Sequence, residues 1–394
     1  MPQALDLAVP ELCFGAGSLS RLPDIVQKLG TDRPSLLIVD PGLAALGERA
    51  NGLLNGKGLE STLFTSFGSD PRSAQIDAAA EAARQARAGA VIGIGGGSAL
   101  DVAKLAAAVA AGNRGAEDYA LCRAPLPAQA LPCVLLPTTA GTGSEATRTA
   151  VFTTCEGAKV WAWGPELRAR VALLDPELTC ALPRHLTVST GLDALVHAME
   201  AVTSRRANAM SEAPALQAIR LVRQALPRAV DAPEDLEARG LLLLAAWLAG
   251  QAIDIAGTGI AHALGHALGA VAGLHHGRAV ALSLKVALPT NVQVSPAAHA
   301  AIARAFGLSG ERDEALAERL PEAFAAFLEE LGLDPQLPAS LDPERLLQAT
   351  LREENQPMLQ ANCRRYSKGE LRALIEQIAS NQVQAAPVSS LPTA

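Results

Sequence analysis

The chain has 394 residues, of which 49% are hydrophobic and 19% are charged, and this composition is typical of a globular protein with two domains. Its net charge of −7 gives no basic surface for nucleic acid or for an anionic membrane. Residues 1–10 contain no Lys or Arg and no apolar run, so no secretory signal is expected. The six cysteines form no CxxC pair, which favours reduced thiols and a cytoplasmic protein.

The first third of the chain alternates short β-branched runs with alanine-rich runs. We expect strands at residues 35–40 (SLLIVD), 90–94 (AVIGI) and 131–137 (LPCVLLP). We expect helices at residues 73–88 and 98–111. Because strands alternate with helices, the pattern predicts a parallel, doubly wound sheet that binds a dinucleotide.

The pattern changes beyond about Asp175, where alanine- and leucine-rich helical runs take over. These runs lie at residues 215–225, 236–253, 296–306 and 314–331. The last run should break at Pro321. The apolar run 241–253 is shorter than the roughly 18–20 residues that span a bilayer, so it predicts a buried core helix. The sequence therefore predicts an α/β domain at residues 1–184 and an all-helical domain at residues 185–394.

Three glycines and a serine, at residues 95–98, separate a predicted strand from a predicted helix. They are Gly95, Gly96, Gly97 and Ser98. Glycines allow a ligand to approach the backbone, and the free N–H groups of the following helix favour an anion, so a diphosphate is the expected guest. Asp101, in the first turns of that helix, joins the cofactor-binding candidates. The dinucleotide fingerprint GxGxxG is not met, and a tight turn without a ligand is the alternative.

A second polar loop, at residues 138–145, follows the strand that ends at Pro137. Its hydroxyl groups on Thr138, Thr139 and Thr142 suit a phosphate or a ribose, although a surface turn would have the same composition. Asp40 ends its own strand at the same edge of the sheet. A carboxylate there accepts hydrogen bonds from ribose hydroxyls and repels a 2′-phosphate, which favours NAD over NADP.

Histidines are concentrated in the second half of the chain. Five of the seven histidines lie between residues 197 and 276. With one aspartate they form three short motifs: Asp193 with His197, His262 with His266, and His275 with His276. A spacing of four residues places two side chains on one face of a helix.

Each of these histidines, taken alone, is more often a core or surface residue than a metal ligand. Together they indicate a metal site, because several buried imidazoles without partners would cost a few kcal/mol each. Carboxylate oxygen and imidazole nitrogen suit Fe²⁺ or Zn²⁺, and the absence of thiolates argues against a structural zinc. The ligand types do not choose between the two metals.

Six motifs, in this order along the chain, resemble the iron-dependent (group III) alcohol dehydrogenase family. They are GGGSALDVAK (95–104), PTTAGTGSEAT (137–147), DPELT (175–179), TGLDALVHAMEA (190–201), GIAHALGHALGA (259–270) and HHG (275–277). The resemblance implies an α/β domain and a helical domain with the site in the cleft between them. This is the fold that the family shares with dehydroquinate synthases.

The resemblance also implies a role for individual residues. The implied metal ligands are Asp193, His197, His262 and His276. The implied cofactor contacts are Asp40, Gly96, Gly97, Ser98, Thr138, Thr139, Thr142 and Lys159. His266 corresponds to a histidine near the nicotinamide that is not a ligand, and it is our candidate for proton relay.

The implied reaction is hydride transfer between NAD(H) and an alcohol/aldehyde or ketone pair, with the metal acting on the substrate oxygen. Iron is the implied metal, with zinc as the alternative, and a homodimer is common in the family. Two relatives of the same fold, maleylacetate reductase and glycerol dehydrogenase, are alternative enzymes. A nucleotide-binding protein without catalysis is the alternative from another class.

Several residues depart from the family pattern outside the metal motifs. Asp70 stands where Asn is frequent, Ala169 where Pro is frequent, and Cys363 where Pro is usual. Trp161 and Trp163 are unusual beside the cofactor lysine. These departures affect the expected substrate and the fine cofactor contacts, and they leave the reaction type unchanged.

Overall fold

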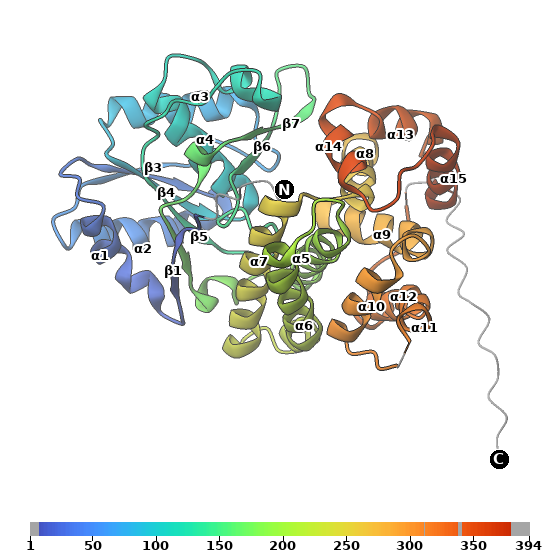
Figure 1. Cartoon of the computed structure of the whole chain (residues 1–394). Helices are drawn as coiled ribbons and strands as arrows, with labels where there is room; N and C mark the ends of the chain where they lie inside the picture. Colours follow the sequence, from blue (N-terminus) through green and yellow to red (C-terminus); the bar gives the residue numbers. More distant parts are fainter. Residues whose placement is uncertain (1–7, 311, 338–340, 380–394) are drawn as a thin grey trace.

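The computed structural model describes residues 8–310, 312–337 and 341–379. It confirms an α/β domain followed by a helical domain (Figure 1). The two domains lie side by side, and the first helix of the helical domain, α5, runs along their junction with α7 (Figure 1).

The α/β domain is built on six parallel strands in the order β1-β8-β5-β4-β2-β3. The strands are β1 (Glu11–Phe14), β2 (Ser35–Val39), β3 (Ser61–Phe64), β4 (Ala90–Gly95), β5 (Cys133–Pro137) and β8 (Val171–Leu174). Every residue of β2, β4, β5 and β8 is buried. Burial on both faces explains why these strands are continuous apolar runs in the sequence.

Helices cover both faces of the sheet. They are α1 (Leu22–Lys28), α2 (Ala44–Asn55), α3 (Ser73–Gln85) and α4 (Gly97–Ala111). Successive residues of β2 alternate between the two faces: Leu36 and Ile38 pack with α3 and α4, whereas Leu37 and Val39 pack with α1 and α2. The sheet is therefore the middle layer of three.

Two further strands, β6 (Thr149–Thr153) and β7 (Lys159–Trp163), form an antiparallel hairpin separate from the main sheet. The hairpin follows the second polar loop and lies against α4 and the helical domain (Figure 1). It places Lys159 and Trp161 at the cleft between the domains.

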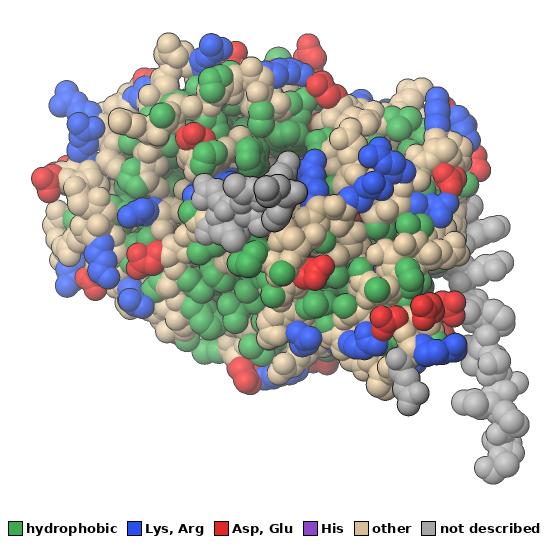
Figure 2. Space-filling view, in the orientation of Figure 1, with side chains coloured by type: hydrophobic (Ala, Val, Ile, Leu, Met, Phe, Trp, Pro, Cys, Tyr) green, Lys and Arg blue, Asp and Glu red, His purple; other side chains and the backbone are tan. Residues whose placement is uncertain are grey.

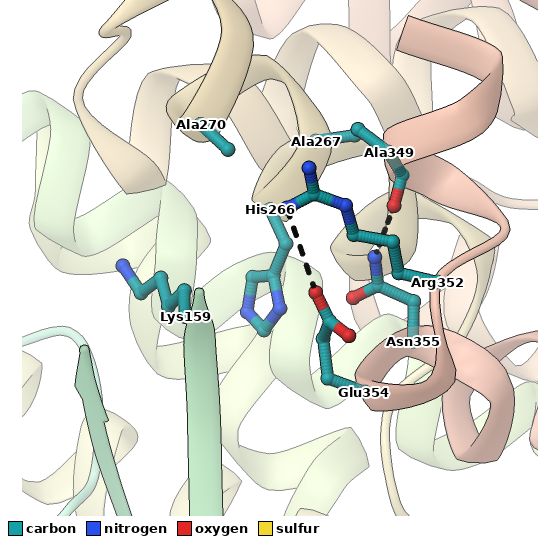
Figure 3. A pocket seen from close by; sticks show the side chains of 8 residues that line it. All are labelled: Lys159, His266, Ala267, Ala270, Ala349, Arg352, Glu354 and Asn355. Atoms are coloured by element: carbon teal, nitrogen blue, oxygen red, sulfur yellow. Dashed lines mark hydrogen bonds and ion pairs between the residues drawn. The ribbon is translucent and has the colours of Figure 1, made fainter. Parts of the chain in front are cut away.

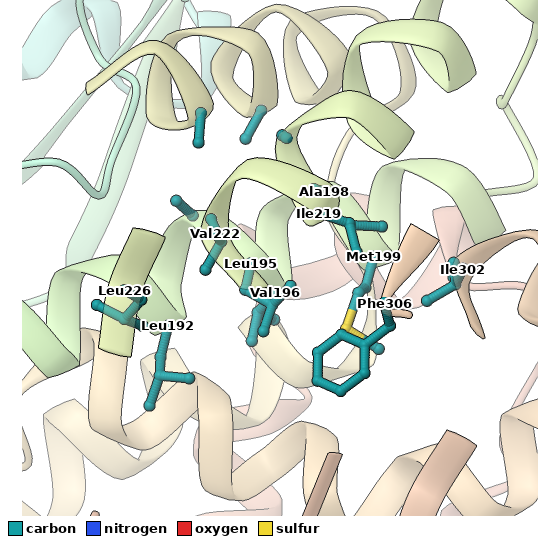
Figure 4. Packing of buried hydrophobic residues seen from close by; sticks show 14 of the residues in the cluster. Leu192, Leu195, Val196, Ala198, Met199, Ile219, Val222, Leu226, Ile302 and Phe306 are labelled. Carbon is teal, nitrogen blue, oxygen red and sulfur yellow. The ribbon is translucent and has the colours of Figure 1, made fainter. Parts of the chain in front are cut away.

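The helical domain begins at α5, and no strand follows β8 among the described residues. Its helices are α5 (Arg184–Thr203), α6 (Ala209–Asp231), α7 (Leu236–Ala256), α8 (Ile260–Ala272), α9 (His276–Val292), α10 (Pro296–Ala305), α11 (Asp313–Glu318), α12 (Leu320–Glu330), α13 (Pro343–Thr350), α14 (Gln356–Ala361) and α15 (Lys368–Ala379). Helix α5 is buried almost throughout. Its apolar side chains pack against α6 and α10, where Met199 lies near Phe306 (Figure 4).

The structure refines the elements expected from the sequence. The strand expected at residues 35–40 ends at Val39, and Asp40 caps the short helix that follows. The run 314–331 is broken as expected, but the break falls at Arg319, and Pro321 lies in the first turn of α12, where proline is tolerated. Strands β1, β3 and β8 and the hairpin were not predicted, because short strands carry too little periodicity.

Helix α7 is longer than the apolar run at its centre and spans Leu236–Ala256. By length and composition alone it could cross a membrane, and it is the only described helix that passes this test. In the fold it packs lengthwise against α5 and α6 and contributes Leu242, Leu243 and Ala246 to the core. The prediction of a buried core helix is therefore confirmed.

Glycines bring the two domains into backbone contact. A Cβ atom on Gly141 would lie 2.7 Å from Thr190 Cβ of α5. Gly143 has φ +60°, and a Cβ there would lie 2.5 Å from the Ala246 carbonyl oxygen of α7. Residues 138–145 are thus held directly on the helices of the second domain, and larger residues would separate the two.

Asp175, directly after β8, joins two turns that follow neighbouring strands at the carboxyl edge of the sheet. It is fully buried, and its carboxylate accepts hydrogen bonds from the backbone N–H groups of Gly17, Leu19 and Glu177 at 3.0, 2.9 and 3.1 Å. One carboxylate therefore fixes the segment after β1 and the segment after β8 together.

We predict that Asp175→Asn lowers the free energy of unfolding by about 1–3 kcal/mol, because an amide offers one acceptor oxygen where the carboxylate offers two. Urea unfolding followed by circular dichroism measures the change. A variant as stable as the unaltered protein would show that these turns do not depend on the charge.

Candidate metal and dinucleotide site

Four side chains from three helices converge at the junction of the domains. Asp193 Oδ1 lies 3.9 Å from His197 Nε2, 3.6 Å from His262 Nε2 and 3.5 Å from His276 Nε2. All four atoms lie within 4.8 Å of one another. Ligands at about 2.1 Å from a tetrahedral metal ion are roughly 3.4 Å apart, so the spacing suits one ion.

The helices hold these side chains in place by close packing. Asp193 and His197 lie one turn apart on α5, while His276 is the first residue of α9. A Cβ atom on Gly277 would lie only 1.9 Å from the carbonyl oxygen of Ser189 in α5. The glycine of the HHG motif therefore lets α9 begin against α5, and His275 Nδ1 contacts Ser189 Oγ at 2.6 Å.

Burial and mutual charge set the protonation of the cluster. Burial raises the pKa of the Asp193 carboxyl, but His197 and His276 outweigh this effect and hold it well below its usual value. Burial lowers the pKa of His197 to about 4 and that of His276 to about 3, although Asp193 opposes both shifts. These two imidazoles are neutral near pH 7, as metal ligands must be.

His262 differs from the other two imidazoles because it has a second carboxylate partner. Burial lowers its pKa, but Glu200 and Asp193 outweigh burial and raise it to about 9. Its Nδ1 atom lies 2.6 Å from Glu200 Oε2 on the side away from the cluster.

The cluster leaves polar atoms that only an added group could satisfy. Asp193 Oδ1 and His262 Nε2 are buried and have no hydrogen-bond partner within the described part of the chain. Unsatisfied buried atoms are costly, and a divalent cation at the centre would contact both. The oxygen and nitrogen donors fit Fe²⁺ or Zn²⁺. The His276 side chain is 27% exposed, so the cluster opens toward the cleft on that side.

The predicted dinucleotide loops lie on neighbouring strands. Strand β4 pairs with both β2 and β5, so Asp40, Gly95 and Thr138 meet at one edge of the sheet. The Thr138 N–H donates to the Gly95 carbonyl at 2.9 Å. Gly95 has φ +148°, and a Cβ atom there would lie 2.9 Å from Asp40 Cβ, so only glycine fits.

Helix α4 begins beside this edge, with Gly96 as its N-cap and no side-chain cap. A Cβ atom on Gly97 would lie 2.6 Å from Thr142 Cγ2 of the second loop. The first turn of α4, with Ser98, and the loop carrying Thr139 and Thr142 are therefore packed together. Free backbone N–H groups at a helix start beside threonine hydroxyls are the kind of groups that can bind a diphosphate.

The Asp101 carboxylate makes hydrogen bonds and an ion pair within the protein. It accepts hydrogen bonds from Ser144 Oγ at 2.5 Å and Val151 N at 3.0 Å, and it lies 3.2 Å from Lys104 Nζ. Fully buried Lys104 donates in turn to the Ser144 carbonyl at 2.8 Å. These contacts favour a role in holding the second loop, and direct contact of Asp101 with the cofactor stays a prediction.

His266 lies beside the four clustered side chains but is not one of the residues whose donor atoms converge. Its ring centre is 5.3 Å from that of His276, and it faces a small pocket between the domains. The pocket is lined by Lys159 on β7 and by Arg352, Glu354 and Asn355 on the segment after α13 (Figure 3). Burial, reinforced by electrostatic interaction with His276 and Lys159, holds the pKa of His266 well below its ordinary value.

The structure gives contacts to residues that the sequence singled out, and it adds one residue that the sequence missed. Lys159 Nζ forms an ion pair with Asp70 Oδ1 at 2.6 Å. This ion pair accounts for an aspartate at residue 70, where Asn is frequent in the family. Trp161 Nε1 donates to the Glu354 carbonyl at 3.1 Å and thereby links the hairpin to the helical domain. Glu200 was not singled out from the sequence, although its position seven residues after Asp193 places it on the same face of α5.

Comparisons with known proteins agree with this geometry. The family profile described as iron-containing alcohol dehydrogenase matches residues 10–176, and that of the Fe-containing alcohol dehydrogenase family, C-terminal, matches residues 187–379. Choline dehydrogenase of Bacillus subtilis (strain 168) is 32% identical over 84% of this chain and 86% of its own length. The NAD-dependent methanol dehydrogenase of Bacillus methanolicus is 32% identical over 82% of this chain and 86% of its own length.

Solved structures share the arrangement of both domains. Sulfoacetaldehyde reductase from Bifidobacterium kashiwanohense, crystallised in complex with NAD⁺, superposes with a TM-score of 0.87 and 29% identity. The match covers 96% of this chain and 99% of that one.

A dinucleotide-binding sheet joined to a buried Asp–His cluster defines a metal-dependent oxidoreductase that uses NAD. The chain belongs to the iron-containing alcohol dehydrogenase family. The fold, the family and the NAD-linked interconversion of alcohols with aldehydes or ketones that the sequence predicted are thereby confirmed.

Glu145, beside the buried Lys104 cluster, gives a prediction for pH dependence. Its side chain is 2% exposed, and burial raises its pKa from 4.5 to about 7. The folded protein therefore holds a proton that the unfolded chain releases between these values, so stability should fall as pH rises from about 4.5 to 7. Glu145→Gln should remove that part of the slope.

Urea unfolding of both proteins at a series of pH values measures the effect. Glu48→Gln, which replaces an exposed glutamate of α2, serves as the control and should leave the slope unchanged. If the curves of Glu145→Gln and the unaltered protein run parallel across this range, Glu145 is ionised in the fold and the prediction is wrong.

Proposed function

We propose that this chain interconverts an alcohol with an aldehyde or ketone at a divalent metal ion held by Asp193, His197, His262 and His276. The observation that carries the proposal is the convergence of four donor atoms within 4.8 Å of one another at the domain junction. Fe²⁺ is the metal we propose, in keeping with the family, and Zn²⁺ fits the same donors.

The cofactor is NAD(H), and we propose that it lies along the carboxyl edge of the sheet. The start of α4, from Gly95 to Ser98, would hold the diphosphate, with Thr138, Thr139 and Thr142 on the other side of it. Asp40 would accept hydrogen bonds from the adenosine ribose. Lys159, at the cleft, would contact the nicotinamide half of the cofactor.

Bound metal and nicotinamide supply Lewis-acid and hydride chemistry, respectively. The chain's own part is to orient both and to keep the cleft dry. His266 faces the same cleft, and we propose that its imidazole relays a proton there. The buried carboxylate of Asp193 would balance the positive charge of the ion.

Further proposals concern the organisation of the protein. We place the domain limit between residues 184 and 185, at the first residue of α5 (Arg184–Thr203). We propose a homodimer in the cytoplasm, without nucleic-acid or membrane partners. Strand β1 is at the edge of the sheet, and Phe14 is 44% and Leu236 40% exposed. Hydrophobic side chains also gather on the surface near α7 (Figure 2), which supports contact with a second copy.

We predict that Asp193→Asn and His276→Ala lose the metal and nearly all turnover while staying folded, because each removes one of four ligands. Metal analysis of the purified protein and NADH absorbance with an aldehyde measure the two losses. His299→Gln is a suitable control, because His299 is a buried histidine of α10 outside the cluster. A metal-free His276→Ala protein with full activity would refute the proposed centre.

Cofactor preference offers an independent prediction. Asp40→Asn keeps an oxygen that can accept the Gly42 N–H, now 2.9 Å from Asp40 Oδ1, but removes the charge that repels a 2′-phosphate. The ratio of kcat/KM for NADH over NADPH should fall by roughly tenfold. Initial rates with both cofactors measure the ratio. An unchanged ratio would place the adenosine away from Asp40.

A further inference from the structure

The first turn of α8, which carries His262, is capped by side chains from distant parts of the chain. Its N-cap, Gly259, has no side chain, yet the backbone N–H groups of Gly259, Ile260 and Ala261 all have acceptors. Four N–H groups at the start of a helix lack partners within the helix, so outside acceptors decide how it begins.

Glu200 of α5 supplies most of this cap. Its Oε2 accepts the Gly259 N–H at 2.8 Å and lies 2.6 Å from His262 Nδ1, while its Oε1 accepts the Ala261 N–H at 2.6 Å. The side chain is 3% exposed. An acid at the start of a helix also interacts favourably with the helix dipole.

Asn362, after α14, completes the cap from the other side. Its Oδ1 accepts the Ile260 N–H at 3.2 Å, while its Nδ2 donates to Asn291 Oδ1 at 3.2 Å and to the Arg364 carbonyl at 2.8 Å. A Cβ atom on Gly259 would lie 2.8 Å from both Asn362 Oδ1 and Glu200 Oε1. Only glycine at residue 259 therefore leaves room for both Glu200 and Asn362 to reach the first turn of α8.

We propose that Glu200 is a positioning residue that fixes the tautomer and direction of His262 and so controls how tightly the metal is held. The proposal rests on the function proposed above, because it takes His262 as a ligand through Nε2. Asp193, His197 and Glu200 share one face of α5, so a single helix carries two ligands and orients a third.

The donors around Glu200 give the physical reason. A carboxylate only accepts hydrogen bonds, and it faces two backbone N–H groups and the Nδ1 atom of His262. It thereby keeps the imidazole proton on Nδ1 and leaves the Nε2 lone pair free for the metal. A glutamine has one acceptor and one donor group, so it must direct N–H groups at a backbone donor or at Nδ1.

The key variant is therefore Glu200→Gln, which preserves size and removes only acceptor capacity and charge. Where its amide faces Nδ1, the proton moves to Nε2 and blocks the ligand atom. We expect its dissociation constant for Co²⁺, used as the metal probe, to rise by about 10- to 100-fold. The absorption spectrum of bound Co²⁺ should also change, because Glu200 no longer holds the His262 ring in one orientation toward the metal.

The experiment uses the full chain, stripped of metal with a chelator and titrated with Co²⁺ against a competing chelator. Asp175→Asn is the matched control. Asp175 is likewise a buried carboxylate that accepts several backbone N–H groups, but those groups belong to Gly17, Leu19 and Glu177 and not to the cluster. It should lose stability and keep its Co²⁺ affinity and spectrum.

Two results would overturn the proposal: Glu200→Gln binding Co²⁺ as tightly as the unaltered protein, or Asp175→Asn losing as much affinity as Glu200→Gln. If Glu200→Gln does not fold, Gly259→Ala takes its place, since its added methyl group pushes Glu200 and Asn362 away from the helix. Its Co²⁺ affinity should fall in the same way, and unchanged affinity would count against the proposal.

A measurement on the unaltered protein completes the test. With ¹⁵N-labelled histidine and bound Zn²⁺, the His262 proton should reside on Nδ1 and exchange slowly with water, and a proton on Nε2 would contradict the proposal. Failure of the proposed function gives a different result. In that case the unaltered protein binds no Co²⁺ that depends on Asp193, whatever residue 200 is.

Discussion

A single buried carboxylate, Asp193, determines where three helices of the helical domain meet. Its oxygen has no hydrogen-bond partner in the described part of the chain, and three imidazole nitrogens lie within 3.9 Å of it. A charge in such a place is stable only with compensation of the opposite sign. The helices α5, α8 and α9 must therefore meet at one point, and glycines at their contacts, such as Gly277, make that approach possible.

The same constraint extends to the α/β domain. The loop after β5 follows the sheet edge at which we propose that the dinucleotide binds, and Gly141 and Gly143 place the loop against α5 and α7. Buried Lys104 and Asp101 hold that loop from the side of α4. The cofactor edge and the metal cluster are consequently parts of one packed structure, and hydride transfer requires the two to be in register within about 0.5 Å.

The sequence predicted much of this, and the limits of the prediction have physical causes. Asp193 and His197 were found because a helix repeats its face every four residues, and the buried strands because apolar runs end in glycine or acid. Strand β1 and the β6–β7 hairpin were not predicted because strands of four or five residues carry too little periodicity. Glu200 was missed for a different reason: its role depends on backbone N–H groups of residues 259 and 261, and no local pattern in α5 records them.

The contacts across the cleft differ in kind from one end to the other. At the loop after β5, backbone lies against backbone, whereas at the hairpin the described links include the Trp161 hydrogen bond and an exposed Arg123–Glu353 ion pair. Exposed pairs of this type contribute roughly 0–1 kcal/mol. The two domains are therefore held more closely at the glycine contacts than at the hairpin, so any movement of one domain relative to the other is expected to be larger at the Trp161 end of the cleft.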